Sequence, residues 1–192
     1  KKYIKNNYYY KNYQLFLVTS PLMESHFKEQ CGIDDDKVIR AGYPCCIHNE
    51  AANSFDHNIL KRQGLSENTK IVVYSPTYRD ASATEFFGKA IQDMDRLVEV
   101  LEKNGMLLIF KMHPQMMKDR KYNEAMERYK ACNRLMFWDN QDDIYEVFDQ
   151  IDIAIIDYSS IFYDMLAGGV KHFIRYMFDI DDKNNLRDFV FD

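Results

Sequence analysis

The sequence predicts an α/β protein with a Rossmann-like parallel sheet and helices on both faces. From Lys70 onward, short apolar runs alternate with amphipathic stretches, as is typical of βαβ units. Residues 151–156 are almost entirely apolar, as expected for a central strand buried on both faces. Polar motifs follow the apolar runs, where the carboxyl ends of parallel strands line one crevice.

The first part of the chain contains short elements with clear boundaries. Ser20 is a good N-cap, Pro21 suits the first helical position, and Gly32 is a natural helix terminator. The expected elements are a strand at 15–18, a helix from 21 to about 30, a strand at 37–41, and a helix after 53 that ends near 64.

The rest of the chain alternates regularly. A helix around 91–101 places its apolar residues on one face and is terminated by Gly105. The other expected helices lie at 116–131, at 141–149 and in a short stretch before Gly168. The expected strands lie at 70–74, 106–111, 134–138, 151–156 and 171–176.

Length, charge and cysteine content narrow the class of protein. The 192 residues suffice for one domain or one and a half, and the net charge of −5 argues against a general nucleic-acid binder. The four cysteines form no disulfide framework, which favours reduced thiols in the cytosol. No apolar stretch approaches the ~20 residues of a membrane span. The chain begins without methionine and stops while still apolar, so we expect both ends to lie within a longer protein.

The first fifteen residues combine four lysines with five tyrosines and no acid. Such a segment could lie on an anionic membrane surface. It could also be a linker, or an element that packs against residues upstream. Four lysines meet only the lower end of the usual polybasic cluster, which favours the second interpretation.

Three of the expected strands lead into polar motifs. These motifs are Ser75-Pro76-Thr77-Tyr78-Arg79-Asp80, Lys111-Met112-His113-Pro114 and Asp157-Tyr158-Ser159-Ser160. Arginine and lysine supply positive charge, a helix start with two serines supplies N–H and hydroxyl donors, and a histidine can donate or accept a proton. Because such loops meet at one edge of a parallel sheet, they predict a phosphorylated ligand, such as a nucleoside diphosphate.

Each motif residue also has a purely structural interpretation. The alternatives are an N-cap for Ser159 or Ser160, a structural hydrogen bond for His113, an ion pair with Asp80 or a helix acid for Arg79, and turn positions for Ser75 and Thr77.

Other candidate sites are weaker. Asp93-Met94-Asp95 resembles a metal-binding DxD pair but lies in the amphipathic helix, where a solvated pair is expected. His48 and His57 lack partners at metal-ligand spacing, and glycine-rich nucleotide motifs are missing from the sequence. The sequence therefore predicts no metal site.

Five motifs in order resemble those of the CDP-glycerol glycerophosphotransferase family, the teichoic acid primases and polymerases. The segment 74–80 resembles the family's A-P-T-[WY]-R-D, 111–114 resembles [RK]-x-H-P, and 157–164 resembles D-Y-S-S-[IV]-x-x-D. Gly42-Tyr43-Pro44 resembles G-x-P, and 187–192 resembles R-G-F-x-x-D. The resemblance runs from about residue 15 to residue 192.

The resemblance implies a GT-B fold, with residues 1–55 as the end of the acceptor-side half plus a connector. Residues 56–192 would form a donor nucleotide-binding domain, truncated at its C-terminus. It implies transfer of glycerol or ribitol phosphate from a CDP-activated donor to a hydroxyl of a wall or capsule polymer, with release of CMP. It implies no cofactor, a lipid-linked acceptor and a cytoplasmic, peripheral location at the inner face of the membrane.

The resemblance also implies roles for particular residues. His113 would act at the diphosphate, as a base or as an electrostatic stabiliser. The phosphate-binding residues would be Ser159, Ser160, Arg79, Thr77, Asp157, Lys111 and Arg187.

The chain departs from the family pattern in several places. Cys45-Cys46-Ile47 replaces R-N-D, Asp188 replaces the glycine of the late motif, and the H-G-T motif of the N-terminal half does not occur. We therefore expect this chain to bind donor without catalysis. Two alternatives remain open, a GT-B glycosyltransferase that uses a UDP- or GDP-sugar and a non-catalytic nucleotide-diphosphate binding module.

Overall fold

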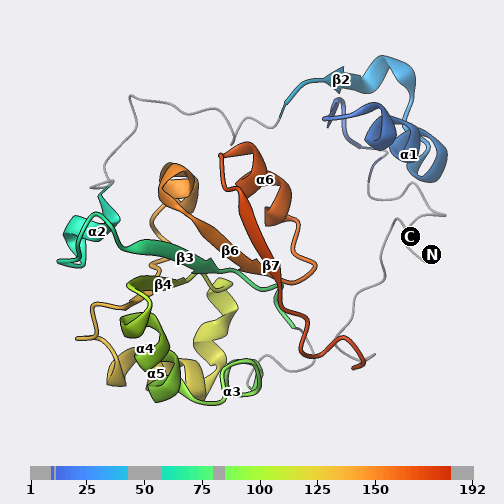
Figure 1. Cartoon of the computed structure of the whole chain (residues 1–192). Coiled ribbons are helices and arrows are strands. Elements are labelled where there is room, and N and C mark those ends of the chain that lie inside the picture. Colours follow the sequence, from blue (N-terminus) through green and yellow to red (C-terminus); the bar gives the residue numbers. More distant parts are fainter. Residues whose placement is uncertain (1–9, 11, 43–57, 80–84, 183–192) are drawn as a thin grey trace. The chain divides into compact units, whose positions relative to one another are not determined.

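The computed structural model describes residues 10, 12–42, 58–79 and 85–182 (Figure 1). The chain divides into two compact units, Lys1–His48 and Asn49–Asp192. The predicted boundary near residue 55 lies outside the described residues. So do the start of the helix predicted after residue 53, most of the lysine- and tyrosine-rich segment, and the residues Tyr43, Pro44, Cys45, Cys46, His48, His57, Asp80 and Arg187.

The first unit contains a short parallel strand pair and one longer helix. The Ser20 hydroxyl accepts the Met23 N–H at 3.2 Å, and Gly32 ends the helix with φ of 64°, so both predicted ends are confirmed. Strands β1 and β2 pair in parallel with Phe16 opposite Val38. The elements are β1 (Phe16–Val18), α1 (Pro21–Cys31), η1 (Asp35–Lys37) and β2 (Val38–Arg40).

The second unit contains a parallel sheet of five described strands, in the order β5-β4-β3-β6-β7. The strands are β3 (Lys70–Tyr74), β4 (Met106–Phe110), β5 (Leu135–Phe137), β6 (Ile153–Ile156) and β7 (His172–Arg175). The chain runs outward from β3 through β4 to β5 and then returns to the other side of β3. The direction of the strand order therefore changes between β3 and β6, which is where open α/β sheets bind ligands.

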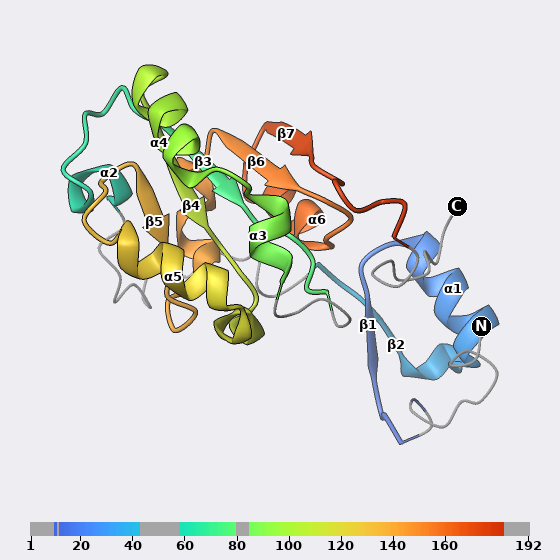
Figure 2. The same cartoon turned by 90° about the horizontal axis from the view of Figure 1, so that it is seen from below.

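Helices cover both faces of this sheet, as predicted (Figure 1). Seen from below, α3, α4 and α5 lie over β3 and β4 (Figure 2), while α2, η4 and α6 belong to the core on the opposite face. The helices are α2 (Ile59–Arg62), α3 (Phe86–Ala90), α4 (Met94–Lys103), η3 (Pro114–Lys118), α5 (Arg120–Arg128), η4 (Ile144–Gln150) and α6 (Ile161–Ala167).

The central strands are buried on both faces because their side chains alternate between the two cores. In β3, Ile71 and Val73 pack on the α6 side, whereas Val72 and Tyr74 pack on the α4 side. Each of these four side chains is at most 5% exposed. The apolar runs of the sequence thus follow from a sheet that is covered twice.

The structure differs from the predicted helices around Asp119. The helix predicted at 116–131 is divided into η3 and α5, because the buried Asp119 carboxylate caps α5 by accepting the Lys121 and Tyr122 N–H groups. The same carboxylate accepts the Phe87 N–H at 2.8 Å and thereby supports α3, which was not predicted. The helix predicted at 141–149 is a 3₁₀ helix that begins at Ile144.

Candidate functional site

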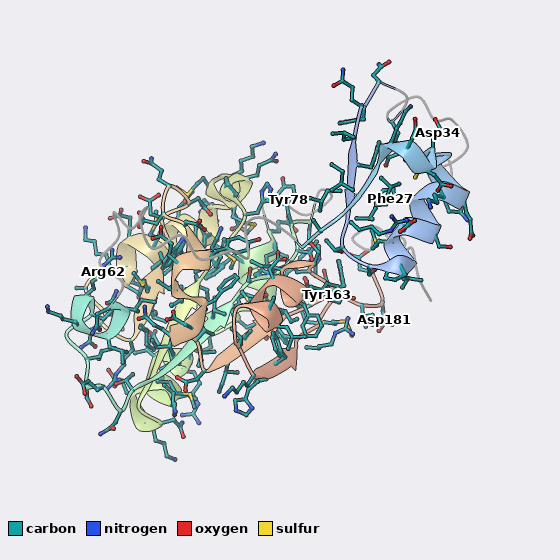
Figure 3. All side chains as sticks on the ribbon, turned by 90° about the horizontal axis from the view of Figure 1, so that it is seen from above. Phe27, Asp34, Arg62, Tyr78, Tyr163 and Asp181 are labelled. Carbon is teal, nitrogen blue, oxygen red and sulfur yellow. The ribbon has the colours of Figure 1, made fainter. Side chains whose placement is uncertain are left out.

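A pocket of about 290 Å³ lies where β3, β4 and β6 end. The three polar loops meet there, since β3 lies between β4 and β6 in the sheet. Figure 3 shows Tyr78 and Tyr163 at this end of the sheet and Arg62 at the opposite end. The lining residues are Ser75, Pro76, Thr77, Tyr78, Lys111, His113, Pro114 and Ser159.

His113 lies at the start of η3, directly after β4. Its Nδ1 accepts the backbone N–H of Gln115 at 3.2 Å. A ring nitrogen that accepts a hydrogen bond carries no proton, so the neutral imidazole holds its proton on Nε2. His113 is exposed and lines the pocket. The arrangement makes Nε2–H a hydrogen-bond donor.

The ring of Tyr78 stacks against the His113 imidazole. The ring centroids are 4.8 Å apart and the planes are inclined by 29°. The sequence motif contains Tyr78, but nothing in its local pattern assigned it a role. A stacked partner limits rotation of the imidazole, so Tyr78 helps to set the direction of the Nε2–H bond.

Lys111 places a positive charge beside the same pocket. Its Nζ donates to Oδ1 of Asn140 at 2.6 Å, and its burial lowers the pKa of the amine from the usual lysine value. Asn140 was not among the predicted site residues. Asn140 follows β5 at the carboxyl edge of the sheet. The expectation that ligands bind at the carboxyl ends of parallel strands would therefore have included it.

Ser159 and Ser160 lie between β6 and α6. Ser160 is the N-cap residue of α6, yet its hydroxyl makes no capping hydrogen bond. Ser159 lines the pocket. The alternative interpretation, in which the Ser160 side chain serves only to cap α6, therefore does not hold. Phosphate binding by either serine stays a prediction.

Thr77 and Asp157 join the loops after β3 and β6. The Asp157 carboxylate accepts the Thr77 N–H at 2.9 Å and the Thr77 hydroxyl at 2.8 Å. Both donors of Thr77 are thus directed at Asp157, which is 2% exposed. Thr77 lines the pocket, and Asp157 holds the Thr77 loop in place through these hydrogen bonds. Phosphate binding by Thr77 and by Asp157 stays a prediction.

Arg79 is buried behind the pocket and does not line it. Its side chain is 1% exposed and forms ion pairs with Asp157 at 2.7 Å and Asp179 at 2.8 Å. The guanidinium also lies 4.6 Å from the centre of the Tyr158 ring. The ion-pair interpretation of Arg79 is realised with partners other than the adjacent Asp80. Direct phosphate binding by Arg79 stays a prediction.

The DxD-like pair has a structural role. Asp93 caps α4 by accepting the Arg96 N–H at 2.8 Å, and Asp95 pairs with Arg128 at 2.6 Å. Within the described ranges, histidine, cysteine and acidic side chains form no group suited to a metal ion. None of the helices in this part of the chain is long and apolar enough to cross a membrane.

Known proteins share this sequence and this fold. The chain is 26% identical over 187 residues to the teichoic acid poly(ribitol-phosphate) polymerase of Bacillus spizizenii. The matched segment covers 95% of this chain and 29% of that protein. It is 32% identical over 163 residues to the poly(glycerol phosphate) polymerase of the same organism, covering 80% of itself and 39% of that relative. The chain thus spans well under half of the length of these relatives.

Among solved structures, the wall teichoic acid polymerase TagF has the same fold. A TagF variant soaked with CDPG superimposes with a TM-score of 0.68 at 21% identity, over 97% of this chain and 44% of the TagF chain. This likeness confirms the predicted fold class, a Rossmann-like sheet of the kind found in the C-terminal half of a GT-B fold.

The sequence model of one family matches residues 2–192, and that family is described as CDP-glycerol:poly(glycerophosphate) glycerophosphotransferase. The match covers nearly the whole chain and agrees with both relatives and with the TagF fold. The chain therefore belongs to the CDP-glycerol:poly(glycerophosphate) glycerophosphotransferase family.

Proposed function

We propose that this chain is the donor-binding part of an enzyme that transfers glycerol or ribitol phosphate from a CDP-activated donor to a hydroxyl of a teichoic-acid-like or capsular polymer, with release of CMP. The observation that carries the proposal is the pocket at the strand-order change, which Lys111, His113 and Ser159 line together. Family membership and the activities in the names of the two relatives support the choice of donor.

The proposed reaction is a displacement at the β-phosphorus of the donor. The acceptor oxygen forms a bond to this phosphorus, and the bond from phosphorus to the bridging oxygen breaks. CMP leaves with that electron pair, while the hydroxyl proton passes to a base. Negative charge develops on the bridging and phosphoryl oxygens, where fixed donors and cations stabilise the transition state most strongly. Lys111 and His113 are the groups in the pocket suited to this task.

The hydrogen bond from Gln115 supports a donor role for His113. Because Nδ1 is occupied, the proton on Nε2 can be shared with a diphosphate oxygen as charge develops there. A general base would need an unprotonated nitrogen directed at the acceptor hydroxyl. We therefore propose that His113 is the electrostatic stabiliser and that the base comes from another part of the full-length protein.

Substitutions at His113 in the full-length protein test this assignment through release of CMP from CDP-glycerol and CDP-ribitol. His113→Ala should lower turnover by roughly 100-fold or more, the usual effect of losing one such donor. His113→Gln should retain more activity than His113→Asn, since only the glutamine amide nitrogen reaches the position of Nε2. Wild-type turnover in His113→Ala would exclude a role for His113, and equal loss in the Gln and Asn variants would favour the base.

Nucleotide preference separates the proposal from the two alternatives. The 192-residue chain should bind CDP more tightly than UDP or GDP and should release no CMP from either CDP-polyol. Tighter binding of UDP or GDP would indicate a glycosyltransferase. CDP binding together with an inactive full-length protein would indicate a non-catalytic module.

We also propose that the acceptor is a lipid-linked polymer and that the protein works at the cytoplasmic face of the membrane. The support is the family, and most of the membrane contact would lie in parts of the protein outside this chain. The full-length protein should sediment with vesicles that contain phosphatidylglycerol at low ionic strength and should dissociate at high ionic strength. Equal recovery with neutral vesicles would contradict an electrostatic contribution.

A further inference from the structure

Asp179 connects the segment after β7 to the loops of the candidate site. Its two carboxylate oxygens accept from Nε and Nη2 of Arg79 at 2.8 and 3.0 Å. The arginine side chain is 1% exposed and the aspartate side chain is 9% exposed. A two-point contact between a guanidinium and a carboxylate fixes the plane of the arginine as well as its position.

From Arg79 the contacts continue to the pocket wall. Nη1 donates to the Asp157 carboxylate at 2.7 Å and to the Thr77 carbonyl at 2.5 Å. The same carboxylate accepts both donors of Thr77. Residues 77 and 79 are thus held on either side of Tyr78, whose ring stacks on His113.

Two other contacts hold the segment after β7 in place. The Tyr176 hydroxyl donates to the Ala90 carbonyl at 2.8 Å, and the Phe178 and Phe86 rings pack with centroids 5.5 Å apart. The Asp179 carboxylate can therefore be removed while the segment stays attached to α3. A change at Asp179 then acts mainly on the orientation of Arg79.

We propose that Asp179 is a positioning residue for the donor site: through Arg79 and Asp157 it holds the loop that carries Thr77 and Tyr78, and through Tyr78 it orients the His113 imidazole. The inference rests on the proposed function for the identity of the ligand, whereas the contacts exist without ligand. Asp179 does not line the pocket, so its effect must pass through these side chains.

The physical reason is the low tolerance of such a site for misorientation. Without the two-point contact to Asp179, the Arg79 guanidinium keeps its Nη1 hydrogen bonds and its contact with the Tyr158 ring, but it loses the pair of hydrogen bonds that fixes its plane. Asp157 then loses a fixed partner, and the Thr77 donors it holds become less well placed. Displacement of a positioned group by about 1 Å can cost up to 100-fold in rate.

The test uses ¹⁵N-histidine labelling of the 192-residue chain, with and without CDP. The ring-nitrogen spectrum of His113 reports which nitrogen holds the proton, and it needs no ligand. Asp179→Ala removes both hydrogen bonds between this carboxylate and Arg79. The nearly isosteric Asp179→Asn replaces one acceptor oxygen by an NH₂ group. The matched control is Asp152→Ala, which removes the Lys70 ion pair and the hydrogen bond from the Ile71 N–H at the opposite end of β3.

Wild type and Asp152→Ala should show the Nε2–H form of His113 and the same CDP affinity. Both Asp179 variants should show a mixture of the two forms and should bind CDP about tenfold more weakly. An unchanged His113 spectrum and unchanged CDP affinity in a folded Asp179 variant would overturn the proposal. If Asp179→Ala does not fold, Asp179→Asn decides by the same two measurements.

The outcome also separates this inference from the proposed function. A wild-type chain that binds no CDP would contradict donor binding, while a changed His113 spectrum in the Asp179 variants would still support the positioning role. Normal CDP binding by wild type and by both Asp179 variants would leave donor binding intact and overturn the role of Asp179.

Discussion

The imidazole of His113 lies against the ring of Tyr78, with 4.8 Å between ring centroids and 29° between the planes. Tyr78 belongs to the loop after β3, and His113 follows β4, the neighbouring parallel strand. The sheet brings the two rings together at its carboxyl edge. The stack and the Gln115 N–H together define how His113 faces the pocket.

The stack predicts a difference between two substitutions of Tyr78. Tyr78→Phe keeps a ring and should retain turnover within about twofold, whereas Tyr78→Leu should lower it roughly three- to tenfold, because a ring pair contributes roughly 0.5–1.5 kcal/mol. The measurement is the initial rate of CMP release by the full-length protein. Equal rates for the Phe and Leu variants would show that the stack does not matter.

Ser160 and Ser20 should differ in what their hydroxyls contribute. The Ser160 hydroxyl should bind the donor, and the Ser20 hydroxyl caps α1. Ser160→Ala should weaken CDP binding roughly three- to tenfold with little change in the free energy of unfolding, since its hydroxyl does not cap α6. Ser20→Ala removes the N-cap of α1 and should lower the free energy of unfolding by about 1 kcal/mol without changing the affinity for CDP. Calorimetric titration and urea denaturation measure the two effects. The reverse pattern would contradict both assignments.

Arg79 should contribute far more to stability than a surface arginine. Arg79→Ala leaves the buried Asp157 carboxylate and the partly buried Asp179 carboxylate without their partner and should cost about 3–5 kcal/mol in the free energy of unfolding. The control is Arg128→Ala, whose exposed ion pair with Asp95 should contribute less than about 1 kcal/mol. Urea denaturation compares them. Similar losses would mean that the Arg79 pairs are not buried in solution.

Glu24 should make the first unit sensitive to acid. Hydrogen bonds from Arg40 and then Lys28 lower the pKa of Glu24 from 4.5 to about 2. Because folding lowers this pKa, the contacts stabilise the folded unit above about pH 5, and the stabilisation disappears as the pH falls toward about 2. The difference in melting temperature between wild type and Glu24→Gln should shrink across this range.

Arg40→Gln provides the control for that measurement. It removes the first cause of the lowered pKa and leaves the Lys28 contact, so its melting temperature should depend less steeply on pH than that of wild type. A constant difference between wild type and Glu24→Gln from pH 7 to pH 2 would contradict the assignment.

Much of the fold was predictable because its signals are local. The apolar runs that form β3, β4 and β6 are continuous in sequence, and the boundaries of α1 follow from Ser20, Pro21 and Gly32. The three pocket loops were predictable for the same reason, since each directly follows one of these strands. Asn140 could have been included by the same rule.

The division at Asp119 and the presence of α3 could not be predicted in this way. Asp119 accepts a hydrogen bond from Phe87, and the two residues are far apart in sequence. No local pattern in either segment indicates that contact. The helix boundaries there depend on a buried carboxylate whose partners are brought together only by folding.

The sequence alone determined the parallel α/β class and the loops that form the candidate site, because burial on both faces of a sheet requires apolar runs and the loops follow those runs directly. The family followed from the motifs in those loops. Only the tertiary structure decided what each loop residue contacts. It directed Arg79 inward to Asp157 and Asp179. It also placed Tyr78 against the His113 ring and the Gln115 N–H against His113 Nδ1. The physical reason is that these contacts join side chains from different strands, and their energies exist only after the sheet has formed.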